Sequence, residues 1–179
     1  MSILKVARMG HPVLRAKAEY VDPVVIRSPE FQRLIDDLIE TMQEYHGVGL
    51  AAPQVHEGVR LFAASIDSAD RLQNEGEGPD VVVLVNPEIV SMADEIVEDW
   101  EGCLSIPDIR GRVPRARDVT MRAFDRDGAR IEVQARDHSA RVLQHEYDHL
   151  DGILFFDRMT SFDTLTFMDE FSRYWSKED

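Results

Sequence analysis

The clearest hydrophobic pattern of the chain lies between residues 28 and 46. Apolar side chains recur there at steps of three and four residues: Phe31, Leu34, Ile35, Leu38, Met42 and Tyr45. This spacing lines one face of an α-helix. Ser28 followed by Pro29 is a favourable helix start, and Gly47 is able to end the helix in the left-handed conformation. The pattern therefore predicts an amphipathic helix over residues 28–46.

The middle of the chain changes to strand-like patterns. Residues 59–64 and 81–85 are short runs of apolar and β-branched side chains, which favour strands. Residues 68–80 between them are polar and acidic, contain glycine, and are typical of a surface loop. Two further runs, 119–124 and 129–135, flank the sequence Asp-Arg-Asp-Gly, which indicates a β-hairpin. The second of these runs alternates apolar and polar residues, so we expect one face of the hairpin to meet solvent.

Helical spacing returns in the last third of the chain. Residues 139–150 predict a helix that Asp137 or Ser139 is able to cap, and Gly152 lies just past its end. Residues 163–175 predict another helix, with apolar side chains gathered on one face.

The order helix, strands, hairpin, helix predicts an α+β fold with mainly antiparallel sheet. The length of 179 residues fits a single domain over residues 1–179. Its last part, residues 160–179, is expected to be a variable, helical C-terminal tail.

The composition is that of an ordinary globular protein and disfavours several classes. The 20 Lys and Arg side chains against 34 Asp and Glu give a net charge of −14, which disfavours a protein that coats nucleic acid. A single cysteine cannot form an intramolecular disulfide and suits a reducing compartment. Lys5 breaks the apolar opening segment, and apolar runs elsewhere are far shorter than a membrane span. We therefore expect a cytoplasmic protein with no membrane segment and no sequence-specific binding to nucleic acid.

One predicted helix contains a metal-binding pattern. His145, Glu146 and His149 match H-E-x-x-H. Helical residues four apart project side by side, so the two imidazoles are able to bind one metal ion. Glu146 is then placed to act as a base on water. The pattern also arises by chance, and a catalytic metal usually has three protein ligands.

The third ligand has two candidates. Cys103 is the only cysteine, and a thiolate is a good ligand for zinc or ferrous iron. A lone cysteine, however, is most often a small buried apolar side chain. No His or Cys follows His149, so the alternative is a downstream carboxylate. That alternative fits an H-E-x-x-H metalloprotease, which would not need Cys103.

Residues 47–54, Gly-Val-Gly-Leu-Ala-Ala-Pro-Gln, follow the first helix. Two glycines among small residues are typical of a helix end and a close crossing of the chain, and the segment matches a nucleotide-binding loop poorly. Gln54 offers a side-chain amide that is able to donate a hydrogen bond to a developing oxyanion. The segment alone leaves both interpretations open.

Three segments together resemble the signature motifs of the peptide deformylase family. They are residues 47–54, residues 101–105 (Glu-Gly-Cys-Leu-Ser) and residues 144–149 (Gln-His-Glu-Tyr-Asp-His), in this order and spacing. The similarity extends over about residues 2–158. It implies an α+β fold whose mainly antiparallel sheets pack around a central metal-binding helix. It also implies hydrolysis of the N-formyl group from the initiator methionine of nascent polypeptides, with release of formate.

The resemblance also assigns roles to single residues. It implies one divalent metal ion, natively Fe(II), with Zn(II), Ni(II) or Co(II) as substitutes. The ligands of this ion would be Cys103, His145 and His149. Glu146 is then the general base, while Gln54 and the backbone N–H of Leu104 form the oxyanion site. The N-formylmethionyl peptide is expected to contact four residues: Gly47, Val48, Gly49 and Arg110. Glu101 and Arg115 are either separate surface charges or, as the resemblance suggests, an ion pair that holds the metal loop.

The tail departs from many bacterial members, which end in a basic helix thought to dock on ribosomal RNA. Residues 161–179 hold Arg173 and Lys177 against five acidic residues. Arginines gather instead between Arg110 and Arg141, where nine basic and five acidic residues give 9 − 5 = +4. This stretch indicates either strand faces paired with nearby acids or a positive patch for transient contact with the ribosome.

Overall fold

The computed structural model of the chain describes residues 2–67 and 80–176. Its α-helices are α1 (Pro29–Glu44), α2 (Asp137–Leu150) and α3 (Met168–Tyr174). Its strands are β1 (Gly49–Ala51), β2 (Leu61–Ile66), β3 (Asp80–Met92), β4 (Ile96–Cys103), β5 (Ile106–Ala116), β6 (Asp118–Phe124), β7 (Arg130–Arg136) and β8 (Thr166–Phe167). Short 3-10 helices cover Pro12–Arg15, Pro23–Val25, Ala52–Val55 and Phe155–Asp157.

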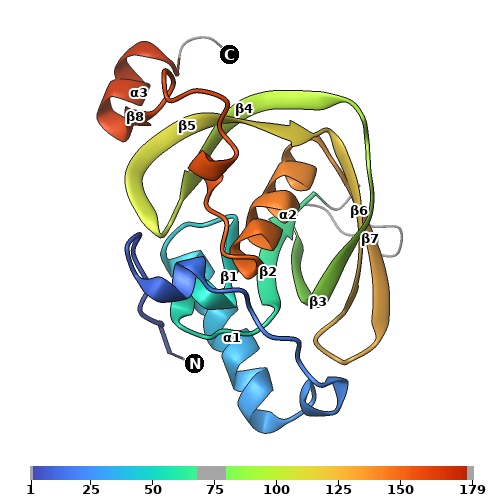
Figure 1. The fold of residues 1–179 in the computed structure, drawn as a ribbon. Coiled ribbons are helices and arrows are strands. Elements are labelled where there is room, and N and C mark those ends of the chain that lie inside the picture. Colours follow the sequence, from blue (N-terminus) through green and yellow to red (C-terminus); the bar gives the residue numbers. More distant parts are fainter. Residues whose placement is uncertain (1, 68–79, 177–179) are drawn as a thin grey trace.

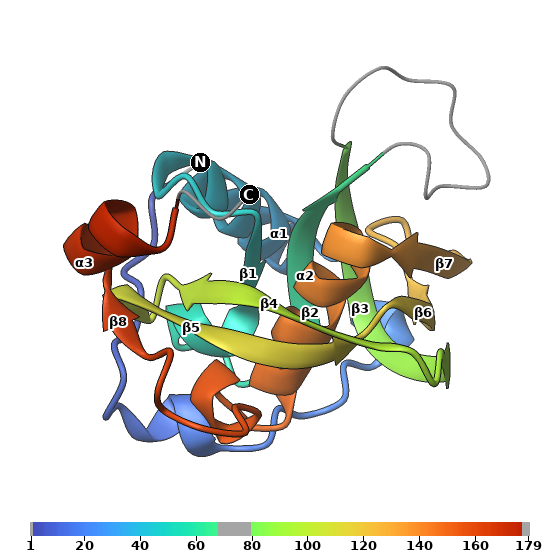
Figure 2. The same ribbon diagram turned by 90° about the horizontal axis from the view of Figure 1, so that it is seen from above.

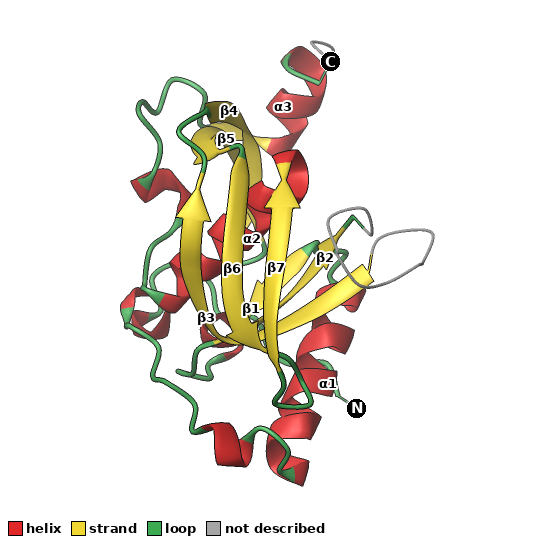
Figure 3. Cartoon of the chain, turned by 90° about the vertical axis from the view of Figure 1, so that its right-hand side faces the viewer, coloured by secondary structure: helices red, strands yellow, loops and turns green. Residues whose placement is uncertain are grey.

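Within the described residues the strands form two antiparallel sheets. One has the order β1-β2-β3-β6-β7, and the other has the order β4-β5-β8. Helix α2 lies at the centre of the molecule and contacts strands of both sheets (Figure 1). Figure 3 shows β3, β6 and β7 side by side with α2 behind them. The predicted α+β fold with mainly antiparallel sheets around a central helix is confirmed.

Two apolar layers hold the larger sheet between helices. On one face Leu143 and Leu150 of α2 pack against Phe62 and Met121, and all four side chains are buried. On the other face the apolar stripe of α1 packs against β2 and β3 in a second cluster. Because α2 is packed against strands on several sides, its orientation is fixed, and so is the direction in which its polar side chains point.

Helix α1 begins where the pattern predicted and ends two residues earlier. The hydroxyl of Ser28 accepts a hydrogen bond from the N–H of Phe31 at 3.2 Å. At the other end His46, not Gly47, takes the left-handed conformation, with φ of 54°. The N–H of Gly47 donates to the carbonyl of Met42 at 2.8 Å, which closes the helix end. Gly47 is needed for space, because a Cβ there would lie 2.9 Å from a side-chain carbon of Leu104.

The predicted strands are present with shifted or extended bounds. Residues 59–64 correspond to β2, which begins at Leu61, and residues 81–85 form only the first part of β3. The predicted hairpin is confirmed as β6 and β7, with Val133 and Ala135 buried between exposed neighbours. The hairpin of β4 and β5 was missing from the sequence prediction. The predicted loop over 68–80 lies outside the described residues, except for Asp80 at the start of β3.

The last two predicted helices need correction. Neither Asp137 nor Ser139 caps α2; Arg136 occupies the cap position without a side-chain hydrogen bond, and Asp137 is already in the first turn. Gly152 follows the helix with φ of 71°, as expected. The tail is less helical than predicted, because β8 interrupts residues 163–175 and α3 covers only residues 168–174.

No helix within the described residues has both the length and the apolar character needed to cross a membrane.

Candidate active site

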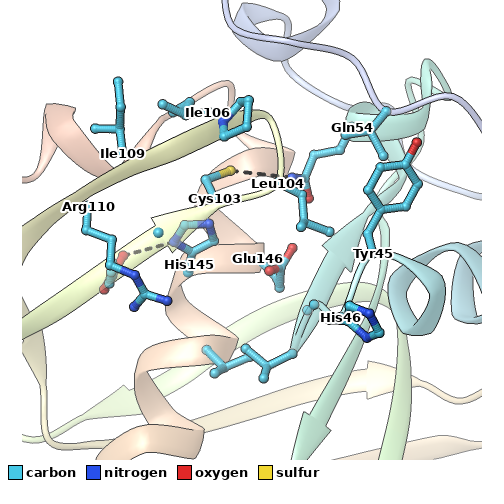
Figure 4. A pocket seen from close by; sticks show the side chains of 18 of the residues that line it. Tyr45, His46, Gln54, Cys103, Leu104, Ile106, Ile109, Arg110, His145 and Glu146 are labelled. Atoms are coloured by element: carbon cyan, nitrogen blue, oxygen red, sulfur yellow. Dashed lines mark hydrogen bonds and ion pairs between the residues drawn. The ribbon is translucent and has the colours of Figure 1, made fainter. Parts of the chain in front are cut away.

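A pocket of about 770 Å³ lies between β1, the turn from β4 to β5, and α2 (Figure 4). It brings together segments that are far apart in the sequence. Of the predicted site residues, ten line this pocket: Gly47, Val48, Gly49, Gln54, Glu101, Cys103, Leu104, Arg110, His145 and Glu146. His149 and Arg115 do not line the pocket, but each contacts a residue that does, Cys103 and Glu101 respectively.

Three potential metal ligands meet at the base of the pocket. Nitrogen and sulfur atoms of Cys103, His145 and His149 all lie within 4.8 Å of one another. Sγ of Cys103 is 3.3 Å from Nε2 of His149. The two histidines are one helical turn apart on α2. Cys103 reaches them because the register between β4 and β5 shifts at this residue.

The electrostatics of this cluster fit a cation. Burial lowers the pKa of His149, so its ring is neutral and has a free electron pair. Burial acts in the same direction on His145, but hydrogen bonds with Cys103 and Glu101 outweigh it and raise the pKa of that ring. The surroundings of His145 therefore stabilise positive charge. One thiolate and two imidazoles are also a typical donor set for zinc or ferrous iron.

Glu146 places a carboxylate beside this cluster. The residue is only 4% exposed, and burial raises the pKa of its side chain to about 7. Among the described residues no group hydrogen-bonds its Oε2. Buried polar oxygens normally have partners, so this atom is positioned to interact with a molecule that enters the pocket.

Gln54 presents its amide group with a fixed orientation. The backbone N–H of Ala51 donates to Oε1 of Gln54 at 2.8 Å. Its Nε2 therefore faces the other way, 3.2 Å from the hydroxyl of Ser105 and 3.5 Å from Sγ of Cys103. The amide hydrogens, not the amide oxygen, are thus directed toward Sγ of Cys103, as an oxyanion donor requires.

Glu101 and Arg115 are in contact, and both are buried. Nε and Nη2 of Arg115 donate to the two carboxylate oxygens of Glu101 at 2.9 and 3.1 Å. The same carboxylate is 2.9 Å from Nδ1 of His145, which orients that ring. Burial acts to raise the pKa of Glu101, but hydrogen bonds from His145 and Arg115 outweigh it and keep the pKa well below its usual range.

Two further charged residues join this network and were missed from the sequence. Arg141 donates to Glu101 at 2.9 Å, and Asp148 accepts from Arg115 at 2.5 Å. Both are buried, at 5% and 4% exposure. Their spacing could have revealed them, because Arg141 is four residues before His145 and Asp148 is three after it. Residues at these steps lie on the same side of a helix. A charged side chain on the buried stripe of a helix needs a charged partner.

Strand β1 gives the pocket an edge that pairs with no second strand within the described residues. Along that edge the N–H of Ala51 already donates to Gln54, while Gly49 has no strand partner there. Gly49 begins β1 and Val48 directly precedes it, and both line the pocket. An extended peptide is able to add to such an edge through backbone hydrogen bonds. Leu104, at the turn after β4, and Arg110 on β5 face the same space (Figure 4).

The fold and the pocket are those expected of a metal-dependent hydrolase, because three clustered metal-binding side chains lie beside a buried carboxylate. Residues 3–164 match the family model of the polypeptide deformylases. The chain is 43% identical to peptide deformylase 2 of Nostoc sp. over 159 residues, which cover 89% of this chain and 87% of that protein. It therefore belongs to the peptide deformylase family, whose general activity is metal-dependent deformylation.

Solved structures give the same result. The chain is similar to the class I type b peptide deformylase of Acinetobacter baumannii with Met-Ala-Ser bound, with a TM-score of 0.79 and 38% identity. That comparison covers 89% of this chain and all of the other. It is also similar to the peptide deformylase of Thermotoga maritima, with a TM-score of 0.78, 35% identity and coverage of 90% and 100%.

Proposed function

We propose that this enzyme removes the formyl group from N-formylmethionine at the start of nascent polypeptides and releases formate, in the cytoplasm. The observation that carries the proposal is the enclosed set of Cys103, His145 and His149 with the carboxylate of Glu146 beside it. The edge of β1 at Gly49 leads to this point and suits the backbone of an extended peptide.

Cys103, His145 and His149 would hold one divalent metal ion. We infer from the resemblance to the peptide deformylases that the native ion is Fe(II), with Zn(II), Ni(II) or Co(II) as substitutes. A thiolate with two imidazoles is a suitable donor set for first-row divalent ions of this kind. Such an ion supplies Lewis acidity, which polarises a carbonyl and lowers the pKa of water.

The residues of the chain supply the remaining chemistry. Glu146 takes a proton from the attacking water and passes it to the nitrogen of the departing methionine. A pKa of about 7 suits both transfers near neutral pH. The amide of Gln54 and the backbone N–H of Leu104 donate hydrogen bonds to the oxygen of the formyl group as it gains negative charge. One such donor is typically worth about 3 kcal/mol.

The proposal is tested by formate release from a formyl-Met tripeptide. The protein is purified without oxygen and its metal content is measured, because a thiolate beside iron is sensitive to oxidation. We expect formate in proportion to the bound metal. Cleavage of internal peptide bonds without formate release would instead identify an H-E-x-x-H metalloprotease.

Replacing Cys103 by alanine is expected to abolish both metal retention and formate release, because the cluster loses its thiolate. Metal analysis after gel filtration and an assay of the same sample check this. His149→Ala is expected to behave alike, while His56→Ala, at an exposed position outside the cluster, keeps its metal. A Cys103→Ala protein that retains both metal and activity would contradict the assigned ligand set.

Gly49→Ala is expected to lower kcat by about 10²-fold through displacement of Glu146. A Cβ at Gly49 would lie 2.2 Å from Oε1 of Glu146, far inside contact distance. Gly58→Ala is the matched control, since nothing lies within 4 Å of a Cβ there. Full activity of Gly49→Ala on formyl-Met peptides would show that this glycine does not make room for the base.

The arginine-rich stretch is mostly neutralised by ion pairs. Within the described residues, ion pairs with carboxylates involve at least six arginines of the stretch: Arg115, Arg117, Arg122, Arg126, Arg136 and Arg141. Three arginines lie over aromatic rings: Arg110, Arg112 and Arg130. This favours paired strand faces over a positive patch. A transient ribosome contact stays a prediction, which sedimentation with purified ribosomes would test.

A further inference from the structure

The C-terminal segment returns to the pocket after leaving α2. Strand β8 adds to the edge of β5, with Ile109 opposite Phe167 and Arg110 opposite Thr166. Helix α3 follows directly and lies at the same end of the β4–β5 hairpin (Figure 2). The family match ends at residue 164, so β8 and α3 lie beyond it.

Helix α3 holds the side chain of Arg110. Nε of Arg110 donates to Sδ of Met168 at 3.1 Å, and its guanidinium carbon is 5.4 Å from the ring centre of Phe171. The flat guanidinium is therefore fixed by one hydrogen bond and one cation–π contact. Figure 4 shows Arg110 across the pocket from Tyr45 and His46.

Aromatic contacts attach α3 to the hairpin. The ring centre of Trp100, on β4, is 4.8 Å from the ring centre of Phe171 and 5.5 Å from that of Trp175. No residue of α3 is fully buried, so these contacts account for much of its attachment. Trp100 also lines the pocket, and α3 is thereby joined to the pocket wall.

We propose that Met168 contacts the bound peptide and that Met168 and Phe171 position Arg110 to donate hydrogen bonds to peptide carbonyl oxygens. The inference rests on the proposed function. Met168 itself lines the pocket. Its Sδ engages Nε of Arg110, while no hydrogen bond or ion pair within the described residues engages either Nη group. These groups remain as donors for the peptide backbone.

This arrangement predicts an effect on substrate binding more than on turnover. Neither Met168 nor Phe171 contacts the Cys103 cluster or Glu146 through a hydrogen bond or ring contact within the described chain. Loss of either side chain would free Arg110 without altering the reacting groups. KM should therefore rise while kcat is kept.

Met168→Ala and Phe171→Ala are expected to raise KM for a formyl-Met tripeptide by about fivefold, with kcat changed by less than about twofold. Phe162→Ala, in the same tail and 67% exposed, is the matched control with unchanged KM. Met168→Leu keeps an apolar wall without the sulfur acceptor and should recover part of the affinity. Thermal unfolding of each variant checks that the fold is intact.

A double-mutant cycle separates positioning from a general structural effect. If Met168 acts partly through Arg110, the two effects are coupled. The fold-increase in KM of the double variant, Met168→Ala with Arg110→Ala, is then smaller than the product of the fold-increases of the two single variants. A KM unchanged in Met168→Ala, or two fully independent changes, would overturn the inference. Calorimetric binding of a methionyl tripeptide gives the same comparison without turnover. An inactive wild-type protein would thus refute the proposed function, while the binding data still decide the role of Met168.

Discussion

Replacing Glu146 by glutamine is expected to lower kcat for formate release by about 10²- to 10⁴-fold, the usual contribution of a general acid–base group. Glutamine has nearly the same shape but cannot accept a proton from water. The carboxylate is buried, and the pKa of about 7 that results makes it an efficient proton acceptor and donor. Stopped assays at saturating formyl-Met tripeptide measure the loss.

The same variant separates catalysis from metal binding. Glu146→Gln should still retain one metal ion per chain, because the three ligands and Glu101 are unchanged. Its thermal stability should not fall, since an ionised carboxylate without a partner is costly in the interior. Glu57→Gln, at an exposed position, is the control with full activity. A Glu146→Gln enzyme with wild-type kcat would remove Glu146 from the mechanism.

Local patterns predicted elements whose packing matches their sequence spacing. Helix α1 could be predicted because its apolar stripe faces one sheet. The β6–β7 hairpin could be predicted because Asp-Gly marks its turn and its second strand alternates apolar and polar residues. Strands β4 and β5 have no such pattern. Most residues of β4 are exposed, and β5 contains Pro107 and Pro114, a residue type that is rare inside strands. These strands pair with each other and border α2, so tertiary contacts decide their structure.

The candidate site divides in the same way. His145, Glu146 and His149 lie within one helical turn, so spacing alone placed them together. Cys103 needed the resemblance, because nothing in its own segment indicates that a register shift turns it toward α2. Met168 was predicted only as part of an apolar helix face. Its place in the pocket follows from the pairing of β8 with β5. Strand β8 has only two residues, which is too short for a recognisable sequence pattern.

Arg115→Ala is expected to lower the free energy of unfolding by about 3–5 kcal/mol, the cost of breaking a buried ion pair by removing one partner. Arg115 is 5% exposed and bridges two buried carboxylates, Glu101 and Asp148. Without it both carboxylates lose their shared cation inside the protein. Arg141 and Arg158 still contact one carboxylate each, which places the loss at the lower end of this range. Urea unfolding of the metal-loaded protein measures the difference.

The control for Arg115 is an arginine with the same kind of partner at the surface. Arg122 contacts Glu132 at 3.3 Å, with both side chains about half exposed, so Arg122→Ala should cost less than about 1 kcal/mol. Because Glu101 also orients His145, Arg115→Ala should weaken metal binding by about 10- to 100-fold, and Arg122→Ala should not. Equal stability of the two variants would mean that the buried network adapts to the loss. Unchanged metal affinity would mean that Arg141 alone keeps Glu101 in place.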